Sequence, residues 1–197
     1  MNDTASLNRP APQTLDLLLS RRSGSAKAMI GPGPGPEELR TIMAAGARVP
    51  DHGKLAPWRF IVIAGDGRAR LGSVLVKALT ETEPGASPVR IEQEQARFLR
   101  APVVVAVVSR ARAGIAIPVW EQQLSAGAVC QNMLIAAHAM GYVGNWITEW
   151  CAYNATVTSA LGLDSGERIA GFLYFGQPAQ PLEERVRPDL DSLITNF

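Results

Sequence analysis

The sequence is poor in the residues that build metal sites and disulfide frameworks. Its 197 residues include only two histidines, His52 and His138, and two cysteines, Cys130 and Cys151. Neither histidine sits beside carboxylates at the spacing of metal ligands, and the two cysteines form no CxxC motif. We therefore expect no metal site and a chain kept in a reduced compartment, with Cys130 as a buried structural thiol inside an apolar helical segment.

Long runs of one residue kind are also missing. The formal net charge is +1, and no block of about five or more like charges occurs, which argues against nucleic-acid binding. The longest uninterrupted apolar stretch, residues 101–108, is far too short to span a bilayer. The N-terminus lacks the basic and apolar regions of a signal peptide. These absences predict a cytoplasmic protein that binds neither nucleic acid nor a membrane.

The signature motifs of several enzyme classes are absent as well. There is no GxSxG elbow, no phosphate-binding P-loop and no HExxH sequence. Residues 60–72 resemble a dinucleotide-binding turn, but Arg70 stands where the third glycine would be, so we predict an ordinary tight strand-to-helix turn. In GPGPGP (31–36) the prolines remove the N–H donors that a phosphate cradle needs, which predicts a turn or linker.

Hydrophobic periodicity predicts a single domain rich in helix. Residues 1–13 are expected to be a flexible lead-in, and residues 14–197 to form one domain that ends in an extended arm. Two predicted helices precede the first strand, so the order is not a clean βαβ alternation. It favours an α+β or three-layer fold with a sheet of about four or five strands flanked by helices. Helices are predicted over 14–22, 36–49, 68–81, 89–99, 118–140 and 155–163, and strands over 60–65, 102–109, 142–148 and 168–176.

Three segments carry groups that suit a planar, phosphorylated ligand. LSRRS (19–23) places Arg21, Arg22 and Ser23 where a helix ends, and guanidinium forks match phosphate oxygens. Two solvated arginines that stabilise a helix C-terminus are the alternative interpretation. GNWIT (144–148) offers Trp146, backbone donors and a threonine hydroxyl, although a plain strand end would look the same.

The third segment is RVPDHGKLAPWRF (48–60). It holds Arg48, His52 and Lys54 between two prolines, which restrict the backbone and so fix where these donors point. Trp58 adds a flat apolar face beside them. Taken alone, the segment also fits an ordinary polar loop that leads into a strand.

Together these residues resemble the FMN-dependent nitroreductase family, and in particular its small members. The likeness runs from about Leu15 to the C-terminus and rests on motifs of differing specificity. The PDHxxxxPW block (50–58) and GFLYxG (171–176) are fairly specific, and RRS (21–23) is not. PxWEQxxSAG (118–127) and GxxGxW (141–146) complete the pattern.

The resemblance implies an α+β nitroreductase-like fold with a central mixed sheet. It implies an intertwined homodimer with the long central helix in the interface and two FMN sites, each made from both subunits. It also implies an NAD(P)H oxidoreductase with ping-pong hydride transfer to flavin N5 and then to a nitroaromatic, quinone or similar acceptor. Residues 136–141 correspond to a segment assigned to nicotinamide binding. The implied FMN-binding residues are Arg21, Arg22, Ser23, Arg48, His52, Lys54, Trp146, Ile147 and Thr148, and no side chain is implied as a catalytic nucleophile or acid.

Departures from the family pattern keep other functions open. Ala26 or Lys27 replaces the second arginine of an RRSxR-like motif, and Ile147 stands where the small members carry arginine after the tryptophan. Only backbone contacts to the flavin are then expected at position 147. A non-catalytic FMN storage or sensor protein is the main alternative, and an interaction domain without flavin is another.

Overall fold

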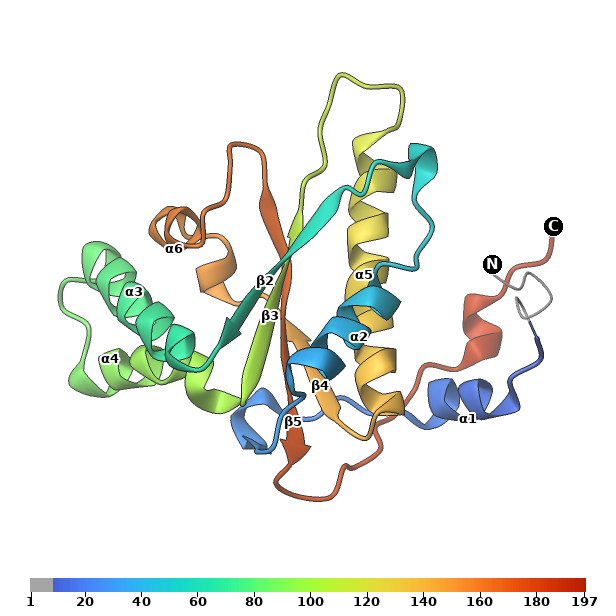
Figure 1. Ribbon diagram of the computed structural model, residues 1–197, viewed down its shortest axis with the longest axis horizontal. Coiled ribbons are helices and arrows are strands. Elements are labelled where there is room, and N and C mark those ends of the chain that lie inside the picture. Colours follow the sequence, from blue (N-terminus) through green and yellow to red (C-terminus); the bar gives the residue numbers. More distant parts are fainter. Residues whose placement is uncertain (1–8) are drawn as a thin grey trace.

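A five-stranded sheet forms the centre of the protein (Figure 1). The computed structural model describes residues 9–197. The strand order of the sheet is β1–β5–β3–β2, and β4 also pairs with β5. The strands are β1 (Met29–Ile30), β2 (Trp58–Ala64), β3 (Val103–Ser109), β4 (Val143–Ile147) and β5 (Arg168–Pro178).

All strand pairs among the described residues are antiparallel, so the mixed sheet that the family resemblance implied is wrong here. A parallel neighbour needs a crossover that returns the chain to the starting end of the strand. Between β2 and β3 the chain instead runs out along α3 (Asp66–Thr82) and back along α4 (Pro88–Gln95). The Gln95 amide reaches the Ala69 carbonyl in the first turns of α3. The chain therefore returns to the end where β2 finishes, and Ala64 pairs with Val103.

Helices cover both faces of the sheet (Figure 1). One face carries α2 (Pro36–Gly46) and α5 (Val119–Ala139), and the other carries α3, α4 and α6 (Ala155–Ala160). Consecutive strand residues point to opposite faces, so Tyr174 joins the core beneath α3 while Phe175 joins the core beneath α5. Strand β5 therefore contributes side chains to both cores, one on each face of the sheet.

Local sequence signals placed most elements correctly. The β-branched run predicted as a strand forms β3, every residue of which is buried. Gly141 has φ of +83°, as expected of a glycine that follows a helix. The Asn154 side chain accepts a hydrogen bond from the Val157 N–H and so begins α6. The turn between β2 and α3 is tight, with Gly65 at φ of +52°.

The ends of the chain differ most from expectation. Helix α1 (Pro12–Ser20) begins inside the predicted lead-in, residues 1–8 of which lie outside the described part. None of the α1 side chains is buried, although Leu15, Leu18 and Leu19 share one face. The loop predicted before α2 contains β1, and the C-terminal arm includes a 3-10 helix at Leu190–Leu193. The predicted helix 89–99 is α4 followed by a 3-10 helix, Arg97–Arg100.

Candidate functional site

An arginine cluster, defined here as Arg21, Arg22, Arg185 and Arg187, joins the end of α1 to the C-terminal arm. The Arg21 guanidinium donates to the Ser23 hydroxyl at 3.0 Å. Arg22 donates to the Glu183 carbonyl at 2.7 Å, and the Glu184 carboxylate lies 3.5 Å from Arg22 and 3.0 Å from Arg187. Sequence reasoning found the first two arginines and missed the two on the arm.

The Arg21 side chain lacks compensation for its charge. Its Nε is buried and finds no hydrogen-bond partner within residues 9–197. Burial lowers the pKa of Arg21, and the nearby charges of Arg187, Arg22 and Arg185 lower it further. A half-buried cation among like charges attracts an anion. Arg22 of this cluster borders a surface hollow that includes Ser23 and Ser25.

Strand β4 lies next to this arginine end. The Gly24 N–H donates to the Gly144 carbonyl at 3.2 Å, and the Asn145 amide donates to the Gly24 carbonyl at 2.5 Å. His138 near the end of α5 places its Nε2 2.6 Å from the Arg22 carbonyl. The structure therefore brings Arg21–Ser23 and the start of the GNWIT strand into one region.

Trp146 and Ile147 lie at the far end of β4, and Thr148 follows the strand. The Trp146 indole donates to the Ala170 carbonyl at 3.0 Å and borders a hollow with Gln123 and Gly127 of α5. Ile147 ends the strand and packs against the core beneath α3. The Thr148 carbonyl lies 3.7 Å from the Cys151 sulfur.

Gly171 on β5 makes room for the Trp146 ring. A Cβ at this position would overlap the indole, so Gly171→Ala must displace the tryptophan or the strand. Overpacking of this kind costs about 1–3 kcal/mol. We expect Gly171→Ala to lower the unfolding free energy by that amount in urea titrations and to shift the tryptophan fluorescence spectrum. A spectrum and stability equal to those of the unsubstituted protein would contradict this packing.

The segment RVPDHGKLAPW is held by an aspartate as well as by its prolines. The Asp51 carboxylate accepts hydrogen bonds from the N–H groups of Leu55 and Ala56, at 3.0 and 2.8 Å. These bonds close a turn in which Lys54 has φ of +54° and Ala56 φ of +44°. Such conformations persist only when the surroundings impose them. Sequence reasoning credited the prolines and missed Asp51.

The same segment runs along α5. The Ser125 hydroxyl donates to the Pro50 carbonyl at 2.8 Å, and the Asn132 amide donates to the Arg48 carbonyl at 3.0 Å. His52 Nδ1 lies 2.7 Å from the Glu121 carboxylate, with both side chains well exposed. Arg48 and Lys54 are exposed. All three side chains predicted in this segment are thus exposed, and His52 contacts α5 through Glu121.

The predicted site residues fall into two groups on opposite sides of α5. Ser125 contacts the RVPDHGKLAPW segment, whereas Gly127 approaches Trp146. Two residues along a helix correspond to a turn of about 200°. No hydrogen bond or ion pair within residues 9–197 joins the two groups. One chain therefore carries two half-sites, named here the arginine half-site (Arg21–Ser23 and Trp146–Thr148) and the histidine half-site (Arg48, His52 and Lys54).

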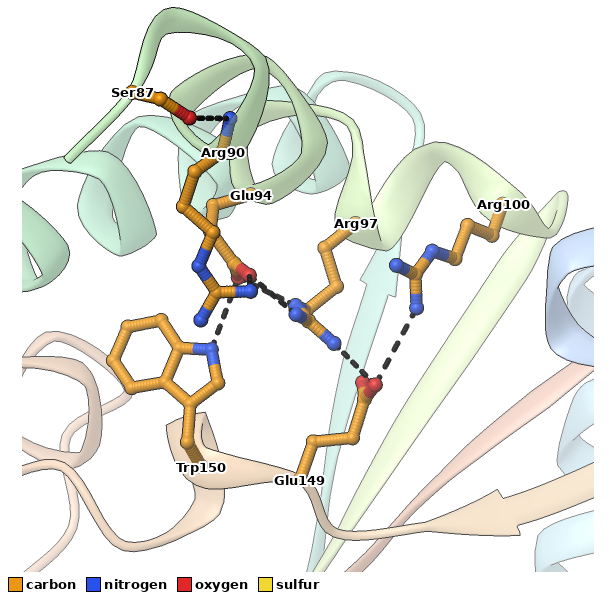
Figure 2. A network of polar contacts seen from close by, with 7 residues as sticks. All are labelled: Ser87, Arg90, Glu94, Arg97, Arg100, Glu149 and Trp150. Atoms are coloured by element: carbon orange, nitrogen blue, oxygen red, sulfur yellow. Dashed lines mark hydrogen bonds and ion pairs between the residues drawn. The ribbon is translucent and has the colours of Figure 1, made fainter.

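A buried ionic network adjoins the end of β4, and sequence reasoning did not find it (Figure 2). Arg97 donates from its Nε to the Glu94 carboxylate at 2.6 Å, and its Nη1 contacts Glu149. Trp150 donates to Glu94 at 3.1 Å, and Arg90 lies 3.0 Å from the same carboxylate. Glu94 is fully buried and Arg97 is 5% exposed. Glu149 and Trp150 come from a part of the chain distant from Glu94 and Arg97, so the local spacing of Glu94 and Arg97 does not reveal the whole network.

Other chemistry finds little support in the described residues. Burial raises the pKa of Cys130 and that of Cys151 to about 12, so both remain neutral thiols, and Cys130 is buried as predicted. Between residues 9 and 197, no three His, Cys, Asp or Glu side chains gather as metal ligands would. No helix in that range combines the length and the apolar character needed to cross a bilayer.

Comparison with known proteins places these features in context. The model of the Nitroreductase family matches residues 31–177. "Putative NAD(P)H nitroreductase YdjA" of Escherichia coli strain K12 is 35% identical over 184 residues, which cover 93% of this chain and 98% of that protein. A nitroreductase-like family protein from Bacillus cereus superposes with a TM-score of 0.83 at 22% identity, covering 96% of this chain and 98% of that one. A "putative nitroreductase in complex with FMN" from Desulfovibrio desulfuricans has a TM-score of 0.71 and 26% identity, covering 96% and 98%.

Proposed function

The chain belongs to the nitroreductase family, and from that premise we propose that it is an FMN-dependent NAD(P)H oxidoreductase. The proposed acceptor is a nitroaromatic, a quinone or a similar compound. The observation that carries the proposal is the arginine cluster, in which Arg21 presents a buried Nε without a partner in the described residues. A relative solved with FMN supports the choice of cofactor.

The donors of the arginine half-site fit a phosphate group. Guanidinium groups bind phosphate oxygens through charge-assisted hydrogen bonds, and the Ser23 hydroxyl already lies 3.0 Å from Arg21. A dianion would also offset the repulsion that lowers the pKa of Arg21. Arg21, Arg22 and Ser23 would hold the phosphate end of FMN, with Arg185 and Arg187 adding charge from the arm.

The remaining residues would orient the flavin ring. When bound, FMN would supply the chemistry of hydride transfer between NAD(P)H and the acceptor. Trp146, Ile147 and Thr148 would lie along one side of the ring. Cations or N–H donors aimed near flavin N1 would favour negative charge there, and the histidine half-site offers Arg48, His52 and Lys54 for that role. None of these side chains is proposed to form a covalent bond with the substrate.

A homodimer would unite the two half-sites. They lie on opposite sides of α5 in one chain, so a second copy packed along α5 can bring the histidine half-site of one subunit to the arginine half-site of the other. Apolar side chains on this surface favour such a contact: Trp120 is 67% exposed and Leu124 is 53% exposed. Leu15, Leu18 and Leu19 of α1 are likewise exposed, with Leu19 at 74%. The FMN site would thus lie at the subunit interface.

Stoichiometry tests this proposal. Purified protein saturated with FMN should sediment as a dimer and carry one FMN per chain, measured by absorbance during analytical ultracentrifugation. Leu124→Glu places a charge in the proposed interface and should weaken the dimer and FMN binding together. A monomer that binds FMN as tightly as the unsubstituted protein would contradict the shared site.

A further inference from the structure

Glu149 has a backbone conformation that residues with a Cβ rarely adopt. Its φ is +56° and its ψ is 177°, a region populated almost only by glycine. Such strain persists where the surrounding structure imposes it, and it clusters at functional sites. Glu149 directly follows Thr148, the last residue of the arginine half-site. The direction of the Ile147–Thr148 backbone therefore depends on how Glu149 is held.

The side chain of Glu149 is held by two arginines from a distant part of the chain. Arg97 contacts the Glu149 carboxylate through Nη1, and Arg100 lies 3.5 Å from the same oxygen. Both arginines belong to the 3-10 helix Arg97–Arg100 that precedes β3. In Figure 2 the Glu149 side chain points toward this helix. The arginines that hold the Glu149 side chain thus lie on an element separate from β4.

Arg97 is itself fixed by Glu94. Its Nε and Nη2 donate to the two carboxylate oxygens of Glu94, which is a planar two-point contact. Burial alone would lower the pKa of Arg97, but hydrogen bonds to Glu94 and Glu149 outweigh burial and raise it. Burial alone would raise the pKa of Glu94, but the hydrogen bond and charge of Arg97 outweigh burial and lower it. Both groups consequently stay charged at neutral pH.

The network also fixes the residue after the strained one. The Trp150 indole donates to Glu94 at 3.1 Å. Glu149 is bound by Arg97 and Trp150 by Glu94, so both residues are held by the Glu94–Arg97 pair. A backbone held at two consecutive side chains has little freedom to relax toward an unstrained conformation. The carbonyl of Glu149 accepts the Ala152 N–H at 3.3 Å and starts the next turn.

We propose that Arg97 is a positioning residue for the flavin site: braced by Glu94, it holds Glu149 in the conformation that aims the Ile147–Thr148 backbone at FMN. This inference rests on the proposed function, because it assumes that the arginine half-site binds FMN. It carries particular weight in this chain, where Ile147 offers the flavin only backbone contacts. An error in backbone direction at position 147 cannot be offset by a flexible cationic side chain.

Two substitutions of Glu149 separate the effect of its contact with Arg97 from the effect of its strained backbone. Glu149→Gln keeps the shape and the strained backbone but removes the charge that Arg97 binds. Glu149→Gly removes that contact and also the strain, since glycine adopts this conformation freely. We expect both variants to bind FMN on the order of tenfold more weakly, equivalent to about one hydrogen bond. We expect Glu149→Gly to melt at a temperature at or above that of Glu149→Gln.

The matched control is Arg90→Met. Arg90 contacts Glu94 in the same network but has no contact with Glu149, so FMN affinity should stay within about twofold of the unsubstituted value. FMN affinity is measured by fluorescence titration. Hydrogen exchange of a peptide covering 145–152, measured on the full chain without FMN, gives a readout independent of the cofactor. Amide exchange at 147–149 should be faster in both Glu149 variants and unchanged in Arg90→Met.

The results distinguish the positioning role from the proposed function. Unchanged FMN affinity in both Glu149 variants would overturn the positioning role, even if their melting temperatures fall. Unchanged exchange at 147–149 would overturn the claim that Arg97 holds this turn. If the unsubstituted protein binds no FMN, the proposed function fails and the positioning role fails with it, while the exchange data still report whether the turn is held.

Discussion

Replacing Arg97 by methionine should lower the free energy of unfolding by about 3–5 kcal/mol, the cost of removing one member of a buried ion pair. Methionine keeps much of the side-chain volume but supplies no donor. Glu94, fully buried, would lose two of its hydrogen bonds, and Glu149 would keep only the longer contact with Arg100. Urea denaturation followed by circular dichroism measures this change.

The double variant Glu94→Met/Arg97→Met is the informative control. Removing both partners leaves no uncompensated charge at the centre of the network, and apolar replacements of a buried ion pair are often close to neutral. Arg90, the other arginine on Glu94, has a side chain that is 37% exposed and can be solvated. The double variant should therefore be more stable than Arg97→Met alone. A double variant less stable than the single one would contradict the assigned pairing.

Arg21→Ala should weaken FMN binding by about ten- to a hundredfold, the loss of one charge-assisted phosphate contact worth about 1.5–3 kcal/mol. Arg21 is the member of the arginine cluster with a buried, unpartnered Nε in the described chain. Removing a cation from among three others also relieves repulsion, so the folded protein should lose little stability. FMN fluorescence titrations at fixed salt measure the change.

Arg40→Ala is the matched control for Arg21→Ala. Arg40 is an exposed arginine on α2, so this substitution changes the net charge equally but touches neither half-site. Its FMN affinity should equal that of the unsubstituted protein. If Arg21→Ala retains FMN as well as Arg40→Ala does, the phosphate assignment is wrong.

Features set by neighbours along the chain could be predicted from the sequence. The β-branched residues of β3, the glycine after α5 and the Asn154 cap of α6 each act within a few residues of themselves. Their physical effects are local, so a window of sequence contains the whole signal. The end of α1 near LSRRS is likewise a local feature, whereas the anion-binding role of Arg21, Arg22 and Ser23 stays a prediction.

Features set by tertiary pairing could not be predicted. Arg187 lies near Arg21 only because the C-terminal arm folds back beside α1, and Arg97 meets Glu149 although β3, α5 and β4 separate them along the chain. The antiparallel pairing of β2 with β3 likewise depends on the packing of α4 against α3, which returns the chain to the end of β2. Asp51 was passed over because an aspartate in a loop carries no signal of which N–H groups it will accept.

The most direct test of the central claim is the visible absorbance spectrum of the purified protein, recorded before and after NADPH or NADH is added without oxygen. The account predicts flavin absorbance, either as isolated or after adding FMN, that bleaches rapidly with one of the two nucleotides. Bound flavin that neither nucleotide bleaches would indicate an FMN storage or sensor protein. A protein that shows no bound flavin even with added FMN would contradict the account altogether.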